Sequence, residues 1–345
     1  MAIDIQDTIG YDVDELFKVI GPNIEKIDTV SAAPYSYWRE TIKQLFRKPS
    51  VFICFIILGL IVLLTIFGPM IRSFPIDFKG DNVERFGQTS SGEFIAVGPN
   101  LTNWFGACTP GMINILKGAD LWTLVWEGAR LSLLLGVTVA AIETVVGILI
   151  GALWGYFRWL DPIMIEFRNF IDNIPSILLF ILFMQIFSQY MNDYAFLIIV
   201  FLLTMFSWMG LASVIRNQII IIRNREYNVA SQTLGSSAKS MVTHNLLPYI
   251  ISVIVSTVSL SIPGAIGAEV GLSFFGLSFN LMNNQITLGQ VLTEATKTNM
   301  GSMSGEWMKY PWILIAPLIV LAPITICFFY LGIALSDASD PKTHR

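Results

Sequence analysis

Residues 225–248 read R-E-Y-N-V-A-S-Q-T-L-G-S-S-A-K-S-M-V-T-H-N-L-L-P and form a polar segment between two long apolar runs. Four residues of this segment recur at the spacing of one helix face, namely Tyr227, Ala230, Ser231 and Leu234. Gly235 follows them, at the place where a helix commonly ends in a left-handed residue. We therefore expect a short helix that ends at this glycine.

A second short helix is expected after the glycine. Ser236 or Ser237 can cap it, and Pro248 suits the first turn of the apolar helix that follows, where a missing N–H costs nothing. The segment thus predicts a compact helix–turn–helix element in water between two membrane spans. Such an element either folds back on its own bundle or docks to a separate soluble protein.

The same segment resembles the "EAA" loop of permease subunits in binding-protein-dependent ABC importers. It follows the pattern E-x-x-x-A-[AS]-x-x-x-G, with the proline of L-L-P thirteen residues after the glycine. The positions that match the C-type permease subunit of oligopeptide and dipeptide systems are Glu226, Tyr227, Ala230, Ser231, Leu234, Gly235, Leu247 and Pro248. Val229 and Asn245 depart from the pattern, since the family often has glutamate and histidine there.

The resemblance implies that this loop is a coupling helix seated in a groove of an ATPase subunit. The interface residues would be Glu226, Tyr227, Ala230, Ser231, Leu234 and Gly235. The implied partners are a second, homologous permease subunit in a heterodimer, two ATP-binding subunits that carry ATP and Mg, and an extracytoplasmic peptide-binding protein. The implied location is the bacterial cytoplasmic membrane.

Composition indicates a membrane protein independently of this resemblance. Of 345 residues, 54% are apolar and 13% are charged, whereas about a quarter of a soluble domain is charged. The mean hydropathy is +0.64. The small net charge of −4 does not indicate nucleic-acid binding. The three cysteines and two histidines predict neither a disulfide framework nor a metal site.

We expect an all-α polytopic membrane protein with six transmembrane helices, of the type I ABC importer permease fold. Apolar runs of about 20 residues place the spans at 51–71, 131–157, 163–187, 195–215, 246–275 and 311–335. The expected divisions are a cytoplasmic tail at 1–34, an amphipathic elbow helix at 35–50, span 1 at 51–71, an extracytoplasmic insertion at 72–129, a permease core at 130–336 with its coupling loop at 225–245, and a cytoplasmic tail at 337–345.

Charge placement sets the predicted orientation. Basic residues at 39–48 precede span 1, and arginines flank residues 225–248, so both sites and both termini should be cytoplasmic. The insertion at 72–129 and the loop at 279–310 are then external, with a short strand expected at 93–98.

Two features of the spans predict how the helices pack. Gly147, Gly151 and Gly155 remove the side chains from one face of span 2 and should allow a neighbouring backbone to approach closely. Pro175 lies inside the predicted third span and should kink it.

Glu143 and Glu269 are ionisable residues at membrane depth and are the candidate translocation-pathway residues. Glu269 opens E-V-G-L-S-F-F-G-L at 269–277, which resembles the family's E-x-x-L-S-F-L-G-L. The alternatives are that Glu143 is a protonated or hydrogen-bonded packing residue, and that Glu269 hydrogen-bonds to interrupted backbone nearby.

The sequence predicts a transport subunit and not an enzyme. It contains no G-x-x-x-x-G-K-[ST] to cradle a nucleotide, and no G-x-S-x-G or H-E-x-x-H. No cofactor is expected on this chain. A nickel importer is the second hypothesis for the substrate, and a self-sufficient ion-coupled carrier using Glu143 and Glu269 is the alternative from another class.

Overall fold

The computed structural model describes residues 37–71, 87–88, 94–95, 98–99, 101, 104–113, 116–277, 286–300 and 310–339. The predicted N-terminal tail at 1–34 and the end of the chain after 339 lie outside these residues. The chain divides into two compact units, Met1–Glu40 and Thr41–Arg345, and the account below concerns the second.

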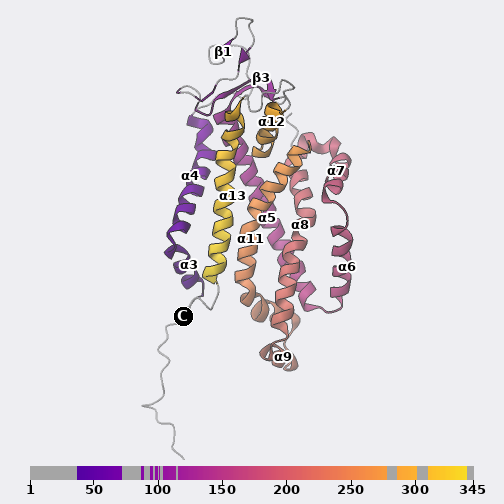
Figure 1. Cartoon of the computed structure of the whole chain (residues 1–345). Coiled ribbons are helices and arrows are strands. Elements are labelled where there is room, and N and C mark those ends of the chain that lie inside the picture. The colour runs from indigo at the N-terminus through magenta and orange to yellow at the C-terminus, as the bar shows by residue number, and fades with distance from the viewer. Residues whose placement is uncertain are drawn as a thin grey trace, which may run out of the picture. The chain divides into compact units, whose positions relative to one another are not determined.

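Five long helices form the bundle in Figure 1: α4 (Pro49–Ile71), α5 (Leu121–Tyr156), α8 (Met191–Arg223), α11 (Leu247–Phe274) and α13 (Pro311–Ser339). Each is long and apolar enough to cross a membrane, and α6 (Leu160–Asp172) with α7 (Ser176–Ile186) makes a sixth span if the bent pair counts as one. The shorter helices are α3 (Tyr37–Arg47), η3 (Ser188–Tyr190), α9 (Glu226–Thr233), α10 (Ala238–Ser240), η4 (Met241–Leu246) and α12 (Leu288–Met300). The prediction of an all-α polytopic membrane protein is confirmed, with five candidate spans, or six if the bent pair is one span. A helix is present where the elbow was expected, and its place in the membrane interface stays a prediction.

Short strands occur in the predicted external insertion. β1 (Gly87–Gln88) pairs antiparallel with β2 (Phe94–Ile95). β2 lies within residues 93–98, where a short strand was expected. β3 (Ala107–Ile113) pairs antiparallel with β4 (Leu116–Asp120), with Ala107 opposite Asp120. In Figure 1 they lie at the opposite end of the bundle from α9.

The second long helix begins earlier than expected, because α5 starts at Leu121, within the predicted insertion at 72–129, and not at 131. Asp120 caps the helix by accepting from the Thr123 N–H at 3.4 Å. The first turns of α5 are buried, and the Trp122 indole N–H donates to the Gly68 carbonyl at 2.9 Å. Tertiary burial therefore extends this helix beyond the apolar run that predicted it.

Two further predictions are corrected by helix boundaries. Pro175 does not kink a continuous helix but separates α6 from α7, which are bent by 83°. Proline lacks an N–H and disfavours helical geometry in the residue before it, so α6 ends at Asp172. The loop at 279–310, predicted to be external, contains α12, whose mixed composition gave no clear helical signal.

The glycine row on α5 packs against α8, as predicted. A Cβ atom added to Gly151 would lie 2.7 Å from the carbonyl oxygen of Ala212 and 2.8 Å from its Cα. One added to Gly155 would lie 2.8 Å from Cβ of Ile219. The two backbones approach more closely than any side chain at these positions would allow.

Polar contacts tie the ends of α5, α6 and α8 together beside this row. Asp161 accepts two hydrogen bonds from the Arg216 guanidinium, at 2.8 and 2.7 Å, and a third from the Trp154 indole at 2.8 Å. Arg223 donates to the carbonyls of Gly155 and Tyr156 at 2.9 and 2.7 Å, which satisfies free acceptors at the C-terminus of α5. A bidentate Arg–carboxylate pair fixes orientation as well as distance.

Gly151→Ala should destabilise the protein although alanine favours helix by about 1 kcal/mol over glycine. The added methyl would meet the Ala212 backbone, and overpacking of this kind costs about 1–3 kcal/mol. Thermal unfolding in detergent measures the effect. The control is Gly59→Ala on α4, where no atom lies within 4 Å of the added carbon. Equal melting temperatures for the two variants would contradict the packing argument.

Candidate functional site

The turn after α9 has the hydrogen bonds of a Schellman motif. Gly235 has φ of +87°, its N–H donates to the Gln232 carbonyl at 3.0 Å, and the Ser236 N–H donates to the Ser231 carbonyl at 3.2 Å. The prediction that α9 ends in a left-handed glycine is confirmed. A side chain with a Cβ would be strained at this φ.

The second half of the segment differs from the expected single helix. Ser237 caps α10 by accepting from the Ser240 N–H at 3.3 Å, which confirms the predicted serine cap. The helix then widens into the π-helical turn η4 before α11 begins, with proline in its first turn. The element is therefore continuous with α11 and is not a free loop.

Asn228 attaches α9 to the end of α8, and the sequence did not indicate it. Its side chain is fully buried, and its Nδ2 donates to the Ile222 carbonyl at 2.8 Å. An asparagine within a polar helix gives no signal of burial, because asparagine is mostly an exposed residue.

With Asn228 turned inward, the predicted interface residues face away from the chain. Tyr227 is 45% exposed and Leu234 is 88% exposed. Glu226, Ala230 and Gly235 are exposed, and Ser231 is partly buried. The structure thus brings all six predicted residues together at one end of the bundle (Figure 1). The Tyr227 ring packs against Tyr249 on one side, with ring centroids 6.1 Å apart, and Leu234 is almost fully exposed. Exposed apolar side chains on a helix fixed to the bundle are the arrangement expected of a docking surface.

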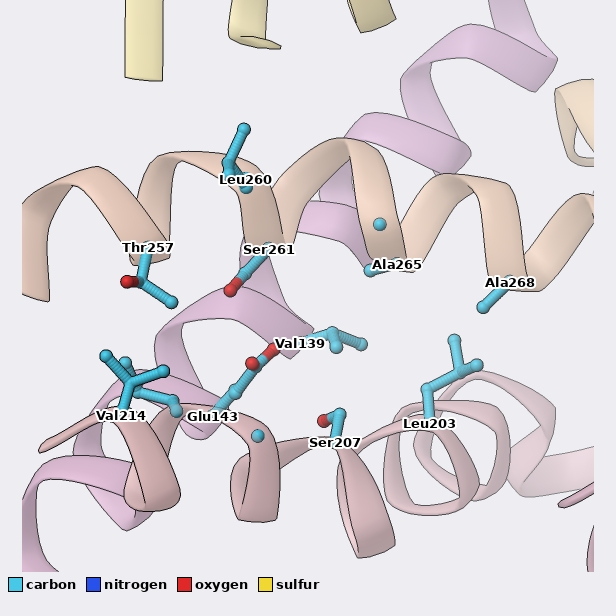
Figure 2. A pocket seen from close by; sticks show the side chains of 13 residues that line it. Val139, Glu143, Leu203, Ser207, Val214, Thr257, Leu260, Ser261, Ala265 and Ala268 are labelled. Carbon is cyan, nitrogen blue, oxygen red and sulfur yellow. The ribbon is translucent and has the colours of Figure 1, made fainter. Parts of the chain in front are cut away.

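A cavity of about 430 Å³ lies between α5, α8 and α11, and Glu143 points into it (Figure 2). Ser261 lines the same cavity, and its hydroxyl faces the Glu143 carboxyl group (Figure 2). A charged side chain at the centre of a membrane helix costs about 2.5–3.5 kcal/mol on insertion scales, so it is expected to face protein or water. The cavity supplies such a setting.

Glu269 lies elsewhere and does not line this cavity. It is 2% exposed, and its Oε1 accepts from Ser273 at 2.8 Å and from the Thr287 hydroxyl. Thr287 also caps α12, since the Gln290 N–H donates to its hydroxyl at 3.2 Å and the Thr287 N–H donates to the Gln290 side chain at 3.1 Å.

The structure therefore does not bring Glu143 and Glu269 together. A Cβ added to Gly289 would lie 2.6 Å from the Glu269 carboxylate, so the start of α12 is packed directly on this group. Glu269 holds α12 against α11, and a pathway role for either glutamate stays a prediction.

Thr287→Val should loosen α12. It removes a helix cap worth about 0.5–2 kcal/mol and one hydrogen bond of a buried carboxyl group, while keeping the side-chain shape. Amide hydrogen exchange over α12 should accelerate. Thr296→Val is the matched control, because that hydroxyl bonds back to the Leu292 carbonyl on the same helix at 2.8 Å. Unchanged exchange in the Thr287 variant would contradict the anchoring role.

Comparison with known proteins places the chain in a family. Residues 147–345 match the model of the binding-protein-dependent transport system inner membrane component, and residues 36–88 match the N-terminal TM domain of oligopeptide transport permease C. The first match covers more than half of the chain and includes α9 and the cavity's α8 and α11 walls.

Curated relatives align over nearly their whole length. The chain is 33% identical to the oligopeptide transport system permease protein AmiD of Streptococcus pneumoniae over 92% of this chain and 94% of that protein. It is 28% identical to the dipeptide transport system permease protein DppC of Bacillus subtilis (96% and 94%) and 26% identical to the oligopeptide transport system permease protein OppC of the same organism (96% and 98%). The chain belongs to the family of inner membrane components of binding-protein-dependent transport systems.

Proposed function

We propose that this chain is a permease subunit of an ATP-driven peptide importer and forms half of its translocation pathway. The observation that carries the proposal is the exposed apolar surface of α9, which lies inside the region that matches the family. A helix of this kind, fixed to the bundle and uncovered in its own chain, suits docking to a separate protein.

In this mechanism the chain transmits motion and performs no covalent chemistry. Two ATP-binding subunits hold ATP and Mg, and each grips one coupling helix, here through Glu226, Tyr227, Ala230, Ser231, Leu234 and Gly235. Closure of the ATPases draws the coupling helices together. Because α9 is bonded to α8, and the turn after α9 leads into α10, η4 and α11, the movement passes to both α8 and α11.

Peptide is the proposed substrate because the relatives above are named for oligopeptide or dipeptide transport. The nickel alternative is not favoured, since those names point to peptides. The remaining partners are a second, homologous permease subunit and an extracytoplasmic peptide-binding protein.

The proposed setting is the bacterial cytoplasmic membrane, with α9 and both termini in the cytoplasm. Arg216, Arg223 and Arg225 lie near α9, and Arg47 and Lys48 lie before α4, as expected where loops face the cytoplasm. The β-strand end of the bundle would then be external and available to the binding protein.

A self-sufficient carrier predicts different behaviour. In liposomes it would move substrate without ATP or other subunits, whereas a permease subunit would need its ATPases. Reconstitution of the purified chain, alone and with the proteins that accompany it from mild detergent, distinguishes the two.

Gly235→Val should uncouple ATP hydrolysis from transport. A β-branched residue at φ of +87° costs well over the roughly 1–2 kcal/mol of the left-handed conformation, so the turn that orients α9 should rearrange. The measurement is peptide imported per ATP hydrolysed in the reconstituted assembly.

Gly235→Asn is the matched control at the same position. Asparagine tolerates the left-handed region, so this variant should keep most of the coupling. Wild-type coupling in the valine variant would show that the α9 turn is not the coupling element.

A further inference from the structure

The cavity in Figure 2 has one charged group on otherwise neutral walls. Of the thirteen described residues that line it, only Glu143 is ionisable, and the polar side chains are Ser207, Thr257 and Ser261. They come from three helices: Glu143 from α5, Ser207 from α8, and the other two from α11. The sequence separates these elements widely, and the fold gathers their oxygens around one space.

These oxygens are not all used by the protein itself. The Ser207 hydroxyl is buried and has no hydrogen-bond partner in the part of the chain that the structure describes. The Ser261 hydroxyl faces Glu143 in the cavity and has lone pairs that can accept. Buried polar groups are normally paired, so the unpaired Ser207 hydroxyl leaves lone pairs free for a donor that the described part of the chain does not supply.

The walls leave room for that donor. Gly210 on α8 and Gly264 on α11 both line the cavity, and no atom lies within 4 Å of a Cβ added to either one. At Gly147, Gly151 and Gly155 of α5, by contrast, an added Cβ would collide with atoms of α8. The space is therefore open and not merely loosely packed.

We propose that this cavity binds an ammonium group of the peptide in transit. The Glu143 carboxylate supplies the opposite charge, and the Ser207 and Ser261 hydroxyl oxygens accept the ammonium's remaining hydrogens. An ammonium has three donors and no acceptor, which fits a site made of a carboxylate and hydroxyls. The proposal rests on the proposed import function and adds a substrate group to it.

Such a site would offset the free-energy cost of moving a charge from water through a helix bundle of low dielectric constant. A cation that leaves water without a partner is strongly disfavoured, and a fixed carboxylate midway offsets that penalty. The ammonium has two sources in a peptide, the α-amino terminus and a lysine side chain, and both fit the same oxygens.

The test uses the complete importer reconstituted in liposomes with Glu143→Gln. Uptake of Ala-Lys-Ala, Ala-Gln-Ala and Ala-Glu-Ala is measured, and each variant rate is divided by the wild-type rate for the same peptide. This ratio cancels the preferences of the binding protein. If the lysine side chain is the ligand, only Ala-Lys-Ala falls, by about tenfold, the size expected for one charge-assisted hydrogen bond.

If the α-ammonium is the ligand, all three peptides fall by about tenfold and Glu143→Asp restores uptake, because it restores the charge. The proposal is overturned if no peptide is affected, or if all fall and the aspartate variant does not recover. It is also overturned if Glu143→Gln lowers the yield of the assembled importer, since Glu143 would then pair with another subunit.

Glu127→Gln is the control variant. Glu127 is also a partly buried glutamate on α5, and it does not line this cavity, so its loss should leave the three ratios equal to one another and near one. Failure of the import function itself would look different, because the wild-type assembly would then show no ATP-dependent uptake of any peptide.

Discussion

The close approach of α5 and α8 is the constraint on which the rest of the described bundle depends. Gly147, Gly151 and Gly155 occupy one face of α5, and backbone and side-chain atoms of α8 fill the space where their side chains would be. Lipid gives helices no hydrophobic reason to associate, so dispersion contacts of this density are a main source of attraction between spans. The polar contacts of Asp161, Arg216 and Arg223 then fix the rotation of the pair at one end.

The cavity is a consequence of the same helix face. Glu143 lies one turn before Gly147, so it continues the face on which the glycines lie. Leu211 covers Gly147 and also lines the cavity. The cavity lies where Glu143 continues this face, while Val139, one turn earlier, again packs in a buried cluster with residues of α8. Tight packing and the candidate pathway are therefore neighbouring parts of one surface.

Much of this architecture was predictable from local sequence signals. Long apolar runs predicted the spans, and Gly235 predicted the end of α9. The glycine spacing predicted a close helix contact on this face of α5, which the structure places against α8. Each of these depends on residues near one another in the chain. Most of the features that were missed depend on distant residues.

Burial of Trp122 under α4 extends α5, and Glu269 holds α12 through Thr287. Neither partner can be identified from local periodicity. The candidate site shows the same division, since its six interface residues follow a local pattern whereas the oxygens around Glu143 come from three separate helices. Asn228 was missed for another reason: its partner Ile222 is near in sequence, but asparagine gives no signal of burial.

The buried amide of Asn228 has a mechanical consequence. A helix joined to its neighbour by a short flexible linker would swing freely, and any load on it would be lost in bending the linker. Here the Asn228 side chain is hydrogen-bonded to the carbonyl of Ile222 in the final turn of α8. This bond fixes the direction of α9 at the end of α8, so a sideways pull on α9 becomes a torque on α8, a helix that has a kink at Tyr194 near its other end.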